Sequence, residues 1–351
     1  MADVRPPRLS LARLPTPLER SRRIGAALGV NLYWKRDDLT GIELSGNKIR
    51  KLEFLFAEAE AQGADTVITC GGEQSNHCRA TALAAAQRGL GCVLLLRVPD
   101  PSAPPAPAAN SLLDRVAGAQ IRYVSFAEYR RRDEIFASVE EDLRRAGRRP
   151  YRIPEGGSNA LGAWGYIAAL EELREQIAAL GAGDAPPPIT LAYAAGSGGT
   201  GAGLELGLRL TGWSAARALG FAVCDDRAYF QQRIADIAGE ASRRFHLGVT
   251  LAPDDIAIDD RFIGPGYAQS TPEMLAVIPE VARADGLVLD PVYTGKAFFG
   301  LRSSIVAAGG RVAASGRQRS ELARNGTIVF LHTGGIFGLF PFAPDLVPSA
   351  R

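Results

Sequence analysis

Three short segments of the chain combine residue types that can bind and transform a small molecule. The first contains Lys48, in the run SGNKIRKLEF, where a glycine turn precedes apolar residues spaced as in an amphipathic helix. A cation in the first turn opposes the helix dipole, so Lys48 and Lys51 together require either solvent or an anion beside them. Lys48 is therefore a candidate reactive amine, and a solvated turn residue is the alternative.

The second segment, AAGSGGTGAGL, joins an apolar strand to a helix predicted from about Thr200. Its backbone N–H groups and hydroxyls can surround a phosphate at the helix N-terminus. The residues concerned are Gly196, Ser197, Gly198, Gly199 and Thr200. The segment lacks the Gly-Lys-Ser/Thr ending of a P-loop and lies in the second half of the chain, which disfavours nucleotide binding. A tight turn that needs glycine only for positive φ is the alternative.

The third segment, CGGEQSNHCRATA, is another junction between a strand and a helix. Ser75, Asn76 and His77 stand together at the predicted helix start, where N–H groups and polar side chains can bind a small anion. A simple helix cap at Ser75 or Asn76 and a structural histidine are the alternatives.

Composition limits the classes of function that these segments can serve. A chain of 351 residues predicts two domains with a ligand-binding cleft between them. The net charge of +2 gives no case for nucleic acid, and we find no signal peptide or apolar run of about 18 residues. We expect a cytoplasmic protein that binds neither nucleic acid nor membrane. Four cysteines without Cys-x-x-Cys spacing and three histidines predict buried free thiols and no metal site.

The elements that must position these segments alternate between strands and helices. Strands are predicted at 66–70, 92–98, 121–124, 151–154 and 189–195, and helices at 76–88, from near 110, at 127–146 and at 163–180. The Pro-rich stretch 99–109 predicts a loop. This order is typical of βαβ units with parallel sheets, and we place a boundary between two α/β units near 156–165.

A lysine, an anion-binding cluster and a phosphate loop together describe an enzyme that uses pyridoxal 5'-phosphate (PLP). The chain resembles the D-cysteine desulfhydrase and 1-aminocyclopropane-1-carboxylate (ACC) deaminase family over nearly its whole length. The motifs that carry the resemblance are SGNKIRKLE, GGEQSNHCRATA, EGGSNALGAWGY, GSGGTGAGL, GPGYAQSTPEM, LDPVYTGKA and HTGG.

The resemblance implies a tryptophan synthase β-like, fold type II architecture. This is an α/β fold with two doubly wound open sheets and PLP in the cleft between them. Residues 1–50 and 165–351 would form the large PLP-binding domain, and residues 51–164 the small domain. The resemblance also implies a homodimer.

Carried over position by position, the resemblance implies a role for each matching residue. Lys48 becomes the Schiff-base lysine, and the cofactor phosphate falls in the loop from Gly196 to Thr200 with Lys51 as a helper. Asn76, with Asn47 nearby, would bond the phenolic oxygen of the cofactor.

The substrate side of the site follows in the same way. Ser75, Asn76 and His77 would receive the substrate carboxylate. Tyr293 would stack on the pyridine ring, and Tyr267 would face the reacting carbons of the substrate.

Departures from the deaminase pattern favour elimination over ring opening. Thr294 replaces the glutamate that deaminases carry near the pyridine nitrogen, and Thr333 is a second neutral hydroxyl expected there. A hydroxyl does not hold that nitrogen protonated, so the ring is a weaker electron sink. His77, where deaminases have glutamine, matches the desulfhydrase branch.

Two departures bear on the substrate itself. Ser45 replaces the first glycine of the usual Gly-Gly-Asn-Lys, and Glu73 stands where a small or apolar residue is expected. Glu73 could select an amine or simply face solvent.

The sequence thus predicts a PLP-dependent lyase for a small β-substituted amino acid, with D-cysteine as the lead substrate. Lys48 would take the Cα proton, with Ser75 or Tyr267 as partner. Alternatives within the family are an ACC deaminase, an L-cysteate sulfo-lyase, a D-serine or diaminopropionate lyase, and a biosynthetic β-substitution enzyme. A protein that only carries PLP is the alternative outside enzymes.

Overall fold

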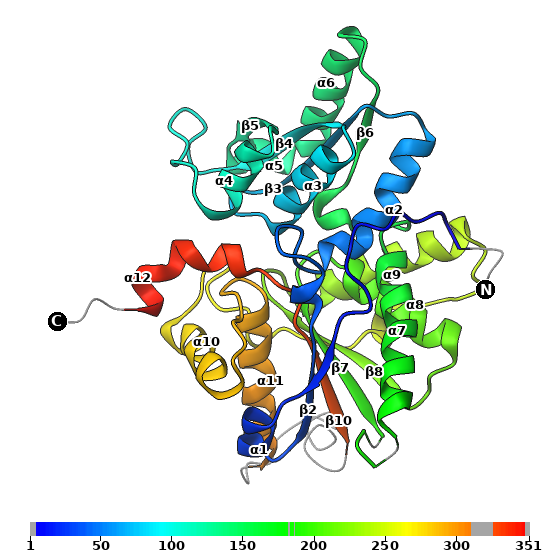
Figure 1. The fold of residues 1–351 in the computed structure, drawn as a ribbon, viewed down its shortest axis with the longest axis vertical. Helices are drawn as coiled ribbons and strands as arrows, with labels where there is room; N and C mark the ends of the chain where they lie inside the picture. The colour runs from blue at the N-terminus through cyan, green and yellow to red at the C-terminus, as the bar shows by residue number, and fades with distance from the viewer. Residues whose placement is uncertain (1–4, 182, 186, 310–325, 348–351) are drawn as a thin grey trace.

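The computed structural model describes residues 5–181, 183–185, 187–309 and 326–347, which form two sheets flanked by helices (Figure 1). The smaller sheet has four parallel strands in the order β5-β4-β3-β6. Their bounds are β3 (Thr66–Gly72), β4 (Gly91–Arg97), β5 (Gln120–Val124) and β6 (Pro150–Arg152). The non-sequential order requires crossovers between strands, as in a doubly wound sheet.

The larger sheet has six strands in the order β1-β2-β10-β7-β8-β9. β1 (Leu18–Arg20) is antiparallel to its neighbour β2 (Asn31–Lys35), and the other pairs are parallel. The remaining strands are β7 (Ile189–Ala195), β8 (Ala216–Ala222), β9 (Ile258–Asp259) and β10 (Thr327–Leu331). Strands from the two ends of the described chain therefore lie side by side in this sheet.

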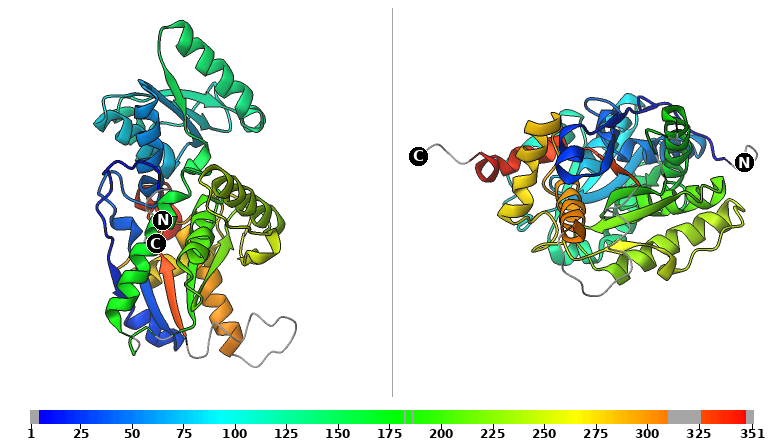
Figure 2. Two further views of the ribbon diagram at one scale, coloured as in Figure 1. Left: turned by 90° about the vertical axis from the view of Figure 1, so that its right-hand side faces the viewer. Right: turned by 90° about the horizontal axis from the view of Figure 1, so that it is seen from below.

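Helices cover both faces of each sheet (Figure 2). Those in the first half of the chain are α1 (Arg23–Leu28), α2 (Lys48–Ala61), α3 (Asn76–Gln87), α4 (Ala109–Val116), α5 (Phe126–Arg130), α6 (Arg132–Arg145) and α7 (Trp164–Leu180). Those in the second half are α8 (Gly199–Thr211), α9 (Arg227–Arg244), α10 (Pro272–Asp285), α11 (Thr294–Gly309) and α12 (Ala343–Leu346). Short 3₁₀ turns include η2 (Asp37–Leu39), η3 (Glu155–Gly157), η4 (Pro253–Asp255) and η5 (Ile336–Phe342).

The core explains why the central strands of the larger sheet, β7 and β10, contain mostly apolar residues. Trp34 and Phe330 pack against Phe298 of α11 on one face of the larger sheet. Their strand neighbours Val329 and Leu331 belong to a separate cluster on the other face, with residues of α7 and α8. Both faces of a parallel sheet are covered by helices, so successive residues of one strand are buried in alternate directions.

The structure confirms the predicted fold class and most of the predicted elements. One element differs, because the helix predicted over 127–146 is two helices, α5 and α6, separated at Arg131 with φ −103° and ψ 27°. The break places both Tyr129 and Phe136 in the core of the smaller sheet. The apolar spacing is helical on either side of Arg131, so the sequence pattern does not reveal the break. The division into domains at residues 50/51 and 164/165 stays a prediction.

The sequence predicts a protein that does not bind membranes, has no metal site and keeps its cysteines as buried free thiols. No described helix is long and apolar enough to cross a membrane. Among the described residues, no group of three or more His, Cys, Asp or Glu side chains could hold a metal ion. All four cysteines are free thiols; Cys70, Cys78 and Cys92 are buried, whereas Cys224 is half-buried.

Candidate active site

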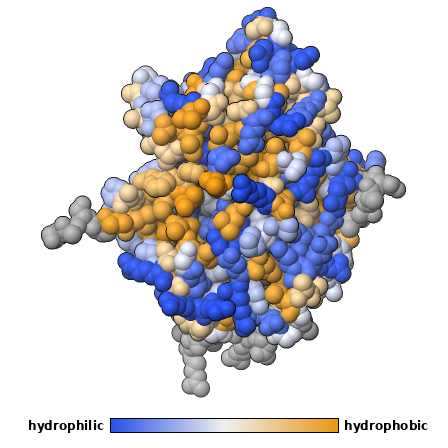
Figure 3. Space-filling model, viewed as in Figure 1, coloured by the Kyte–Doolittle hydropathy of each residue, from blue (hydrophilic) through white to orange (hydrophobic). Residues whose placement is uncertain are grey.

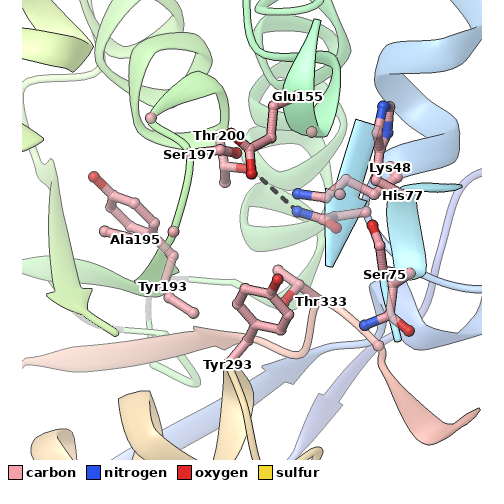
Figure 4. Close-up of a pocket in the computed structure, with 18 of the residues that line it drawn as sticks. Lys48, Ser75, His77, Glu155, Tyr193, Ala195, Ser197, Thr200, Tyr293 and Thr333 are labelled. Carbon is pink, nitrogen blue, oxygen red and sulfur yellow. Dashed lines mark hydrogen bonds between the residues drawn. The ribbon is translucent and has the colours of Figure 1, made fainter. Parts of the chain in front are cut away.

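A pocket lies where the carboxyl ends of strands from both sheets meet (Figure 4). Gly72 ends β3, Ala195 ends β7, and Thr333 follows β10, and all three line the pocket. In the close-up, Lys48, Ser75 and His77 face Ser197 and Thr200 across it, with Tyr293 and Thr333 below. This edge is where open α/β sheets bind ligands.

Lys48 reaches this pocket from the first turn of α2, as the sequence predicts. The turn before it is held in place because the Asn47 N–H donates to the carbonyl oxygen of Thr333 over 3.1 Å. Burial lowers the pKa of Lys48 to about 8, although the carboxylate of Glu155 acts in the opposite direction. A lysine with this pKa is partly neutral near physiological pH, which a nucleophilic amine requires.

The glycine loop lies directly opposite the start of α2. The Asn47 side-chain amide donates to Thr200 Oγ1 over 3.2 Å and so joins the first turns of α2 and α8. Gly198 has φ +84°, which strongly favours glycine. A Cβ on Gly199 would lie 2.8 Å from Lys51 Nζ and 2.6 Å from Ser158 Oγ, so no side chain fits there. The glycines therefore permit close approach as well as a turn.

Lys51 lies behind this loop and supplies a buried positive charge. Its Nζ donates to Ser158 Oγ over 3.2 Å, and Ser158 Oγ lies 2.8 Å from Ser197 Oγ. The side chain is fully buried, and among the described residues it has no ion-pair partner. Burial, with a contribution from Lys48, holds the pKa of Lys51 well below its ordinary value. A buried cation without a counter-ion beside a glycine loop fits the phosphate of PLP.

The Ser75 loop forms the opposite wall. Ser75 Oγ accepts from the Cys78 N–H over 3.2 Å, so the helix cap considered as an alternative is present while Ser75 also lines the pocket. Asn76 lines the pocket as well, and its Oδ1 accepts from Asn110 Nδ2 over 3.1 Å. The loop is thus held from both α3 and α4.

His77 is a neutral, buried member of the same wall. Its Nε2 lies 2.8 Å from Thr69 Oγ1, while Nδ1 has no hydrogen-bond partner within the described residues. Burial and the nearby Lys48 and Lys51 hold the pKa of His77 well below its ordinary value. A neutral imidazole with one free nitrogen can accept or donate one further hydrogen bond, depending on its tautomer.

Glu73 does not line this pocket and instead ties the Ser75 loop to α4. Its Oε1 accepts from Ser111 Oγ over 2.6 Å and from Gln74 Nε2 over 2.8 Å. These bonds engage Oε1 within the protein and favour the structural role over selection of an amine.

Two tyrosines close the pocket from the larger sheet. The hydroxyls of Tyr267 and Tyr293 lie 2.8 Å apart, and their ring centroids are 6.1 Å apart. Burial raises the pKa of Tyr267 to about 12, although the hydrogen bond from Tyr293 lowers it in part. The Tyr267 segment is anchored by Lys296, whose Nζ donates to the carbonyl oxygens of Ile263 over 2.9 Å and Gly266 over 2.6 Å.

The structure brings most of the predicted site residues to the pocket wall, with three exceptions. Lys51 and Gly199 stand immediately behind the wall, as described above. Thr294 is directed elsewhere, because its Oγ1 donates to Asp290 Oδ1 over 2.7 Å and accepts from the Asp290 N–H over 2.7 Å. Thr294 is fully buried at the start of α11, so of the two predicted hydroxyls only Thr333 lines the pocket.

Sequence reasoning missed two polar residues of the pocket wall. Glu155 follows β6 in the EGGSN motif, and its Oε1 accepts from the hydroxyl of Tyr129 over 2.8 Å. Tyr193, from β7, has a buried hydroxyl with no partner among the described residues. The EGGSN motif was a usable signal for Glu155, whereas Tyr193 stands in an apolar strand and gives none.

This fold and pocket define an enzyme that binds PLP, and comparison with known proteins supports the same class. The family model described as "Pyridoxal-phosphate dependent enzyme" matches residues 9–334. The chain belongs to this family, and its cofactor is PLP.

Relatives define the branch of the family more closely. The chain is 42% identical over 338 residues to a bifunctional D-cysteine desulfhydrase/1-aminocyclopropane-1-carboxylate deaminase of Arabidopsis thaliana, covering 94% of this chain and 79% of that protein. It is 39% identical to a D-cysteine desulfhydrase of Yersinia enterocolitica, covering 97% of both. A crystal structure described as an ACC deaminase homologue superposes with a TM-score of 0.82 at 35% identity, covering 97% of this chain and 96% of the other.

Proposed function

We propose that the protein is a PLP-dependent lyase that eliminates the β-substituent of a small amino acid. The lead reaction converts D-cysteine and water to pyruvate, hydrogen sulfide and ammonia. The observation that carries the proposal is the position of Lys48, whose amine faces the Ser75 loop while Lys51 stands behind the glycine loop.

Each residue then has a chemical task. When bound, PLP supplies the electron sink that makes the Cα proton of an amino acid acidic. Lys51, Ser197 and Thr200 hold the phosphate, and Lys48 holds the cofactor through its amine. Ser75, Asn76 and His77 bind the substrate carboxylate.

Proton transfer is the second task. Lys48, with its pKa lowered to about 8, takes the Cα proton as a general base once its amine is free. Tyr267 and Tyr293 share a hydrogen bond at the pocket wall, so a proton placed on the departing group can come from this pair.

The choice of elimination over ring opening is supported by the hydroxyl at Thr333 and by the relatives named D-cysteine desulfhydrase. ACC deamination is the second candidate, because the Arabidopsis relative carries both activities in its name. The remaining alternatives begin with the same abstraction of the Cα proton. They differ in the group that leaves Cβ, as for cysteate, serine and diaminopropionate, or in the group that is added there, as in β-substitution.

We also propose a cytoplasmic homodimer. Apolar side chains gather on the face formed by α4, η5 and α12, which contains exposed Val116 and Phe340 (Figure 3). Exposed apolar patches commonly mark interfaces between subunits. Phe340→Asp is expected to shift the sedimenting species from dimer to monomer, whereas Val306→Asp on α11 should not.

The test of the reaction is a panel of substrates with pyruvate release as the readout. D-cysteine, L-cysteate, D-serine and β-chloro-D-alanine report elimination, and ACC is assayed by release of 2-oxobutyrate. We expect D-cysteine to be turned over and ACC to be much slower. Preferred turnover of ACC would replace elimination by ring opening, and no turnover of any member by the PLP-loaded protein would contradict the proposal.

A further inference from the structure

A second cavity adjoins the pocket and contains an arginine that the proposed reaction does not yet use. The cavity has a volume of about 730 Å³ and shares Glu155, Gly196, Ser197 and Tyr267 with the pocket wall. Arg97, at the carboxyl end of β4, lines this cavity and also a smaller one beside it. Both cavities share Tyr267 with the pocket, so Arg97 lies just outside the pocket wall.

The Arg97 guanidinium is surrounded by aromatic rings. Its central carbon lies 4.8 Å from the ring centroid of Tyr129 and 5.1 Å from each of the ring centroids of Phe126 and Tyr267. Three rings around one guanidinium fix its position more firmly than a single cation–π contact would.

Arg97 differs from Arg132 and Arg152 of this cavity because no described carboxylate pairs with its charge. Arg132 lies 3.7 Å from Glu155, and Arg152 pairs with Glu140 over 2.5 Å. The Arg97 guanidinium has neither a hydrogen bond nor an ion pair with any residue that the structure describes. Its N–H donors are free to bind an incoming anion.

Tyr267 connects Arg97 to the reacting end of the pocket. One side of this tyrosine meets Arg97, and its hydroxyl bonds Tyr293 in the pocket wall. Gly72, the last residue of β3, is the strand partner of Arg97, and a Cβ added there would lie 3.4 Å from the Tyr267 ring. Tyr267 thus has the guanidinium of Arg97 on one side and the hydroxyl of Tyr293 on the other, and it separates Arg97 from the pocket.

We propose that Arg97 binds a negatively charged group on the β-substituent of the substrate. The inference rests on the proposed function, and it extends the substrate class from cysteine to amino acids whose β-substituent carries a sulfonate, carboxylate or comparable anion. A planar guanidinium suits such oxyanions because it donates two parallel hydrogen bonds.

The test compares two β-substituted substrates that differ in charge at that position. Cysteate carries a sulfonate, whereas β-chloroalanine is neutral, and both are assayed as D and L forms by pyruvate release. Arg97→Met keeps an unbranched apolar side chain among the rings and removes the charge. We expect kcat/KM for cysteate to fall about 100-fold, as for loss of charge-assisted hydrogen bonds, and that for β-chloroalanine to change less than about threefold.

A binding experiment separates this inference from the proposed reaction. Aspartate carries a β-carboxylate and alanine does not, and neither has a β leaving group. Calorimetric titration of the PLP-loaded protein should show aspartate binding weakened at least about tenfold by Arg97→Met and alanine binding unchanged. Weaker aspartate binding by the variant would support the role of Arg97 even if no substrate released pyruvate. Absence of pyruvate release would contradict the proposed function but not the role of Arg97.

Two further variants guard against a merely structural effect. Arg97→Lys keeps the charge and should restore part of the preference for cysteate. Arg115→Met removes another arginine that stacks on a tyrosine of the smaller sheet, at 6.0 Å from Tyr123, and should leave the preference unchanged. If Arg97→Met reduced turnover of both substrates equally, or if native protein showed no preference for the anionic member of either pair, the inference would be wrong.

Discussion

Two faces of helix α2 bury a cation each, one with carboxylate partners and the other without. Arg50, 2% exposed, bonds Asp37 Oδ1 over 2.8 Å and Glu172 Oε1 over 2.9 Å, and so has two carboxylates. Lys51, the next residue, is fully buried, and among the described residues its Nζ donates only to a carbonyl and a hydroxyl oxygen. Burial alone would lower the pKa of both cations, but the carboxylates raise that of Arg50 whereas nothing comparable acts on Lys51.

The contrast separates residues that hold the fold from residues that wait for a ligand. A buried ion pair with complete hydrogen bonding is difficult to break from one side, because removal of one partner leaves a buried charge uncompensated. A buried cation without a partner destabilises the protein until an anion arrives. We therefore expect the Arg50 face to control stability and the Lys48 and Lys51 face to control chemistry.

The largest expected effect is on catalysis, from Lys48→Ala. Without the amine, pyruvate release should fall by at least about 10³-fold, because general base catalysis is lost. The urea unfolding free energy of the PLP-free protein should change by less than about 1 kcal/mol, because Lys48 forms no ion pair within 4 Å with any residue that the structure describes. Full turnover in this variant would remove Lys48 from the mechanism, and a large loss of stability would remove the contrast.

Arg50→Met should produce the reverse pattern. It leaves Asp37 and the nearby Glu172 without their main cation, and we expect a loss of about 3–5 kcal/mol in unfolding free energy. Arg88→Met breaks the exposed pair with Glu60 and serves as the control, with an expected loss below about 1 kcal/mol. Equal losses in the two variants would show that burial of the Arg50 cluster adds nothing.

Lys51→Met tests whether the unpartnered cation serves an anion. Binding of inorganic phosphate to the PLP-free protein should weaken about 10- to 100-fold, because a charge-assisted contact is removed. Unfolding free energy without phosphate should stay the same or rise, since the variant no longer buries a charge. Undiminished phosphate affinity, measured by calorimetry, would mean that Lys51 serves only the packing behind Gly199.

The smallest expected effect is on stability, from Asp114. This residue is intermediate between Arg50 and Lys51, because a residue of opposite charge is nearby but no hydrogen bond joins them. It is fully buried beside Arg79, and its carboxylate oxygens have no hydrogen-bond partner among the described residues. Burial raises the pKa of Asp114 to about 8, although Arg79 acts to lower it. An acid with a raised pKa contributes stability below its unfolded pKa near 4, and that contribution is lost as pH rises toward about 8.

Asp114→Asn removes this titration. Relative to the native protein, the unfolding free energy of the variant should rise by about 1–2 kcal/mol as the pH increases from 5 to 6, which is one pH unit between the unfolded and folded pKa values. Urea titrations at both pH values measure the gain, and Asp142→Asn on the exposed face of α6 should show none. A gain toward acid pH instead would mean that Asp114 is ionised and paired with Arg79.

The sequence was informative where chemistry and local pattern coincide. The alternation of strands and helices predicted the fold class. The glycine-containing segments at the starts of α2, α3 and α8 predicted most of the residues that line the pocket. The chain has four lysines among its 40 basic residues, and Lys35, Lys51 and Lys296 are all at most 2% exposed. Because lysine is rare in this chain, each lysine was a candidate for a specific role, and this reasoning would have identified Lys296 as a residue of interest.

What the sequence could not supply is the direction in which side chains point. Thr294 follows Tyr293 directly, yet its hydroxyl turns to Asp290 because the first turn of α11 needs a cap. Arg97 lies in no motif, and its importance depends on Phe126 and Tyr129, which come close only through the pairing of β4 with β5. Such contacts between distant segments are set by tertiary packing.

The opposed faces of α2 also limit how this enzyme can change over evolutionary time. One helical residue corresponds to a rotation of about 100° and a rise of about 1.5 Å. A single insertion or deletion between Lys48 and Lys51 would turn one cation away from its present environment while leaving the composition almost unchanged. Length variation should therefore accumulate in the turn before Gly46 and beyond the end of α2, whereas the four residues from Lys48 to Lys51 keep their phase.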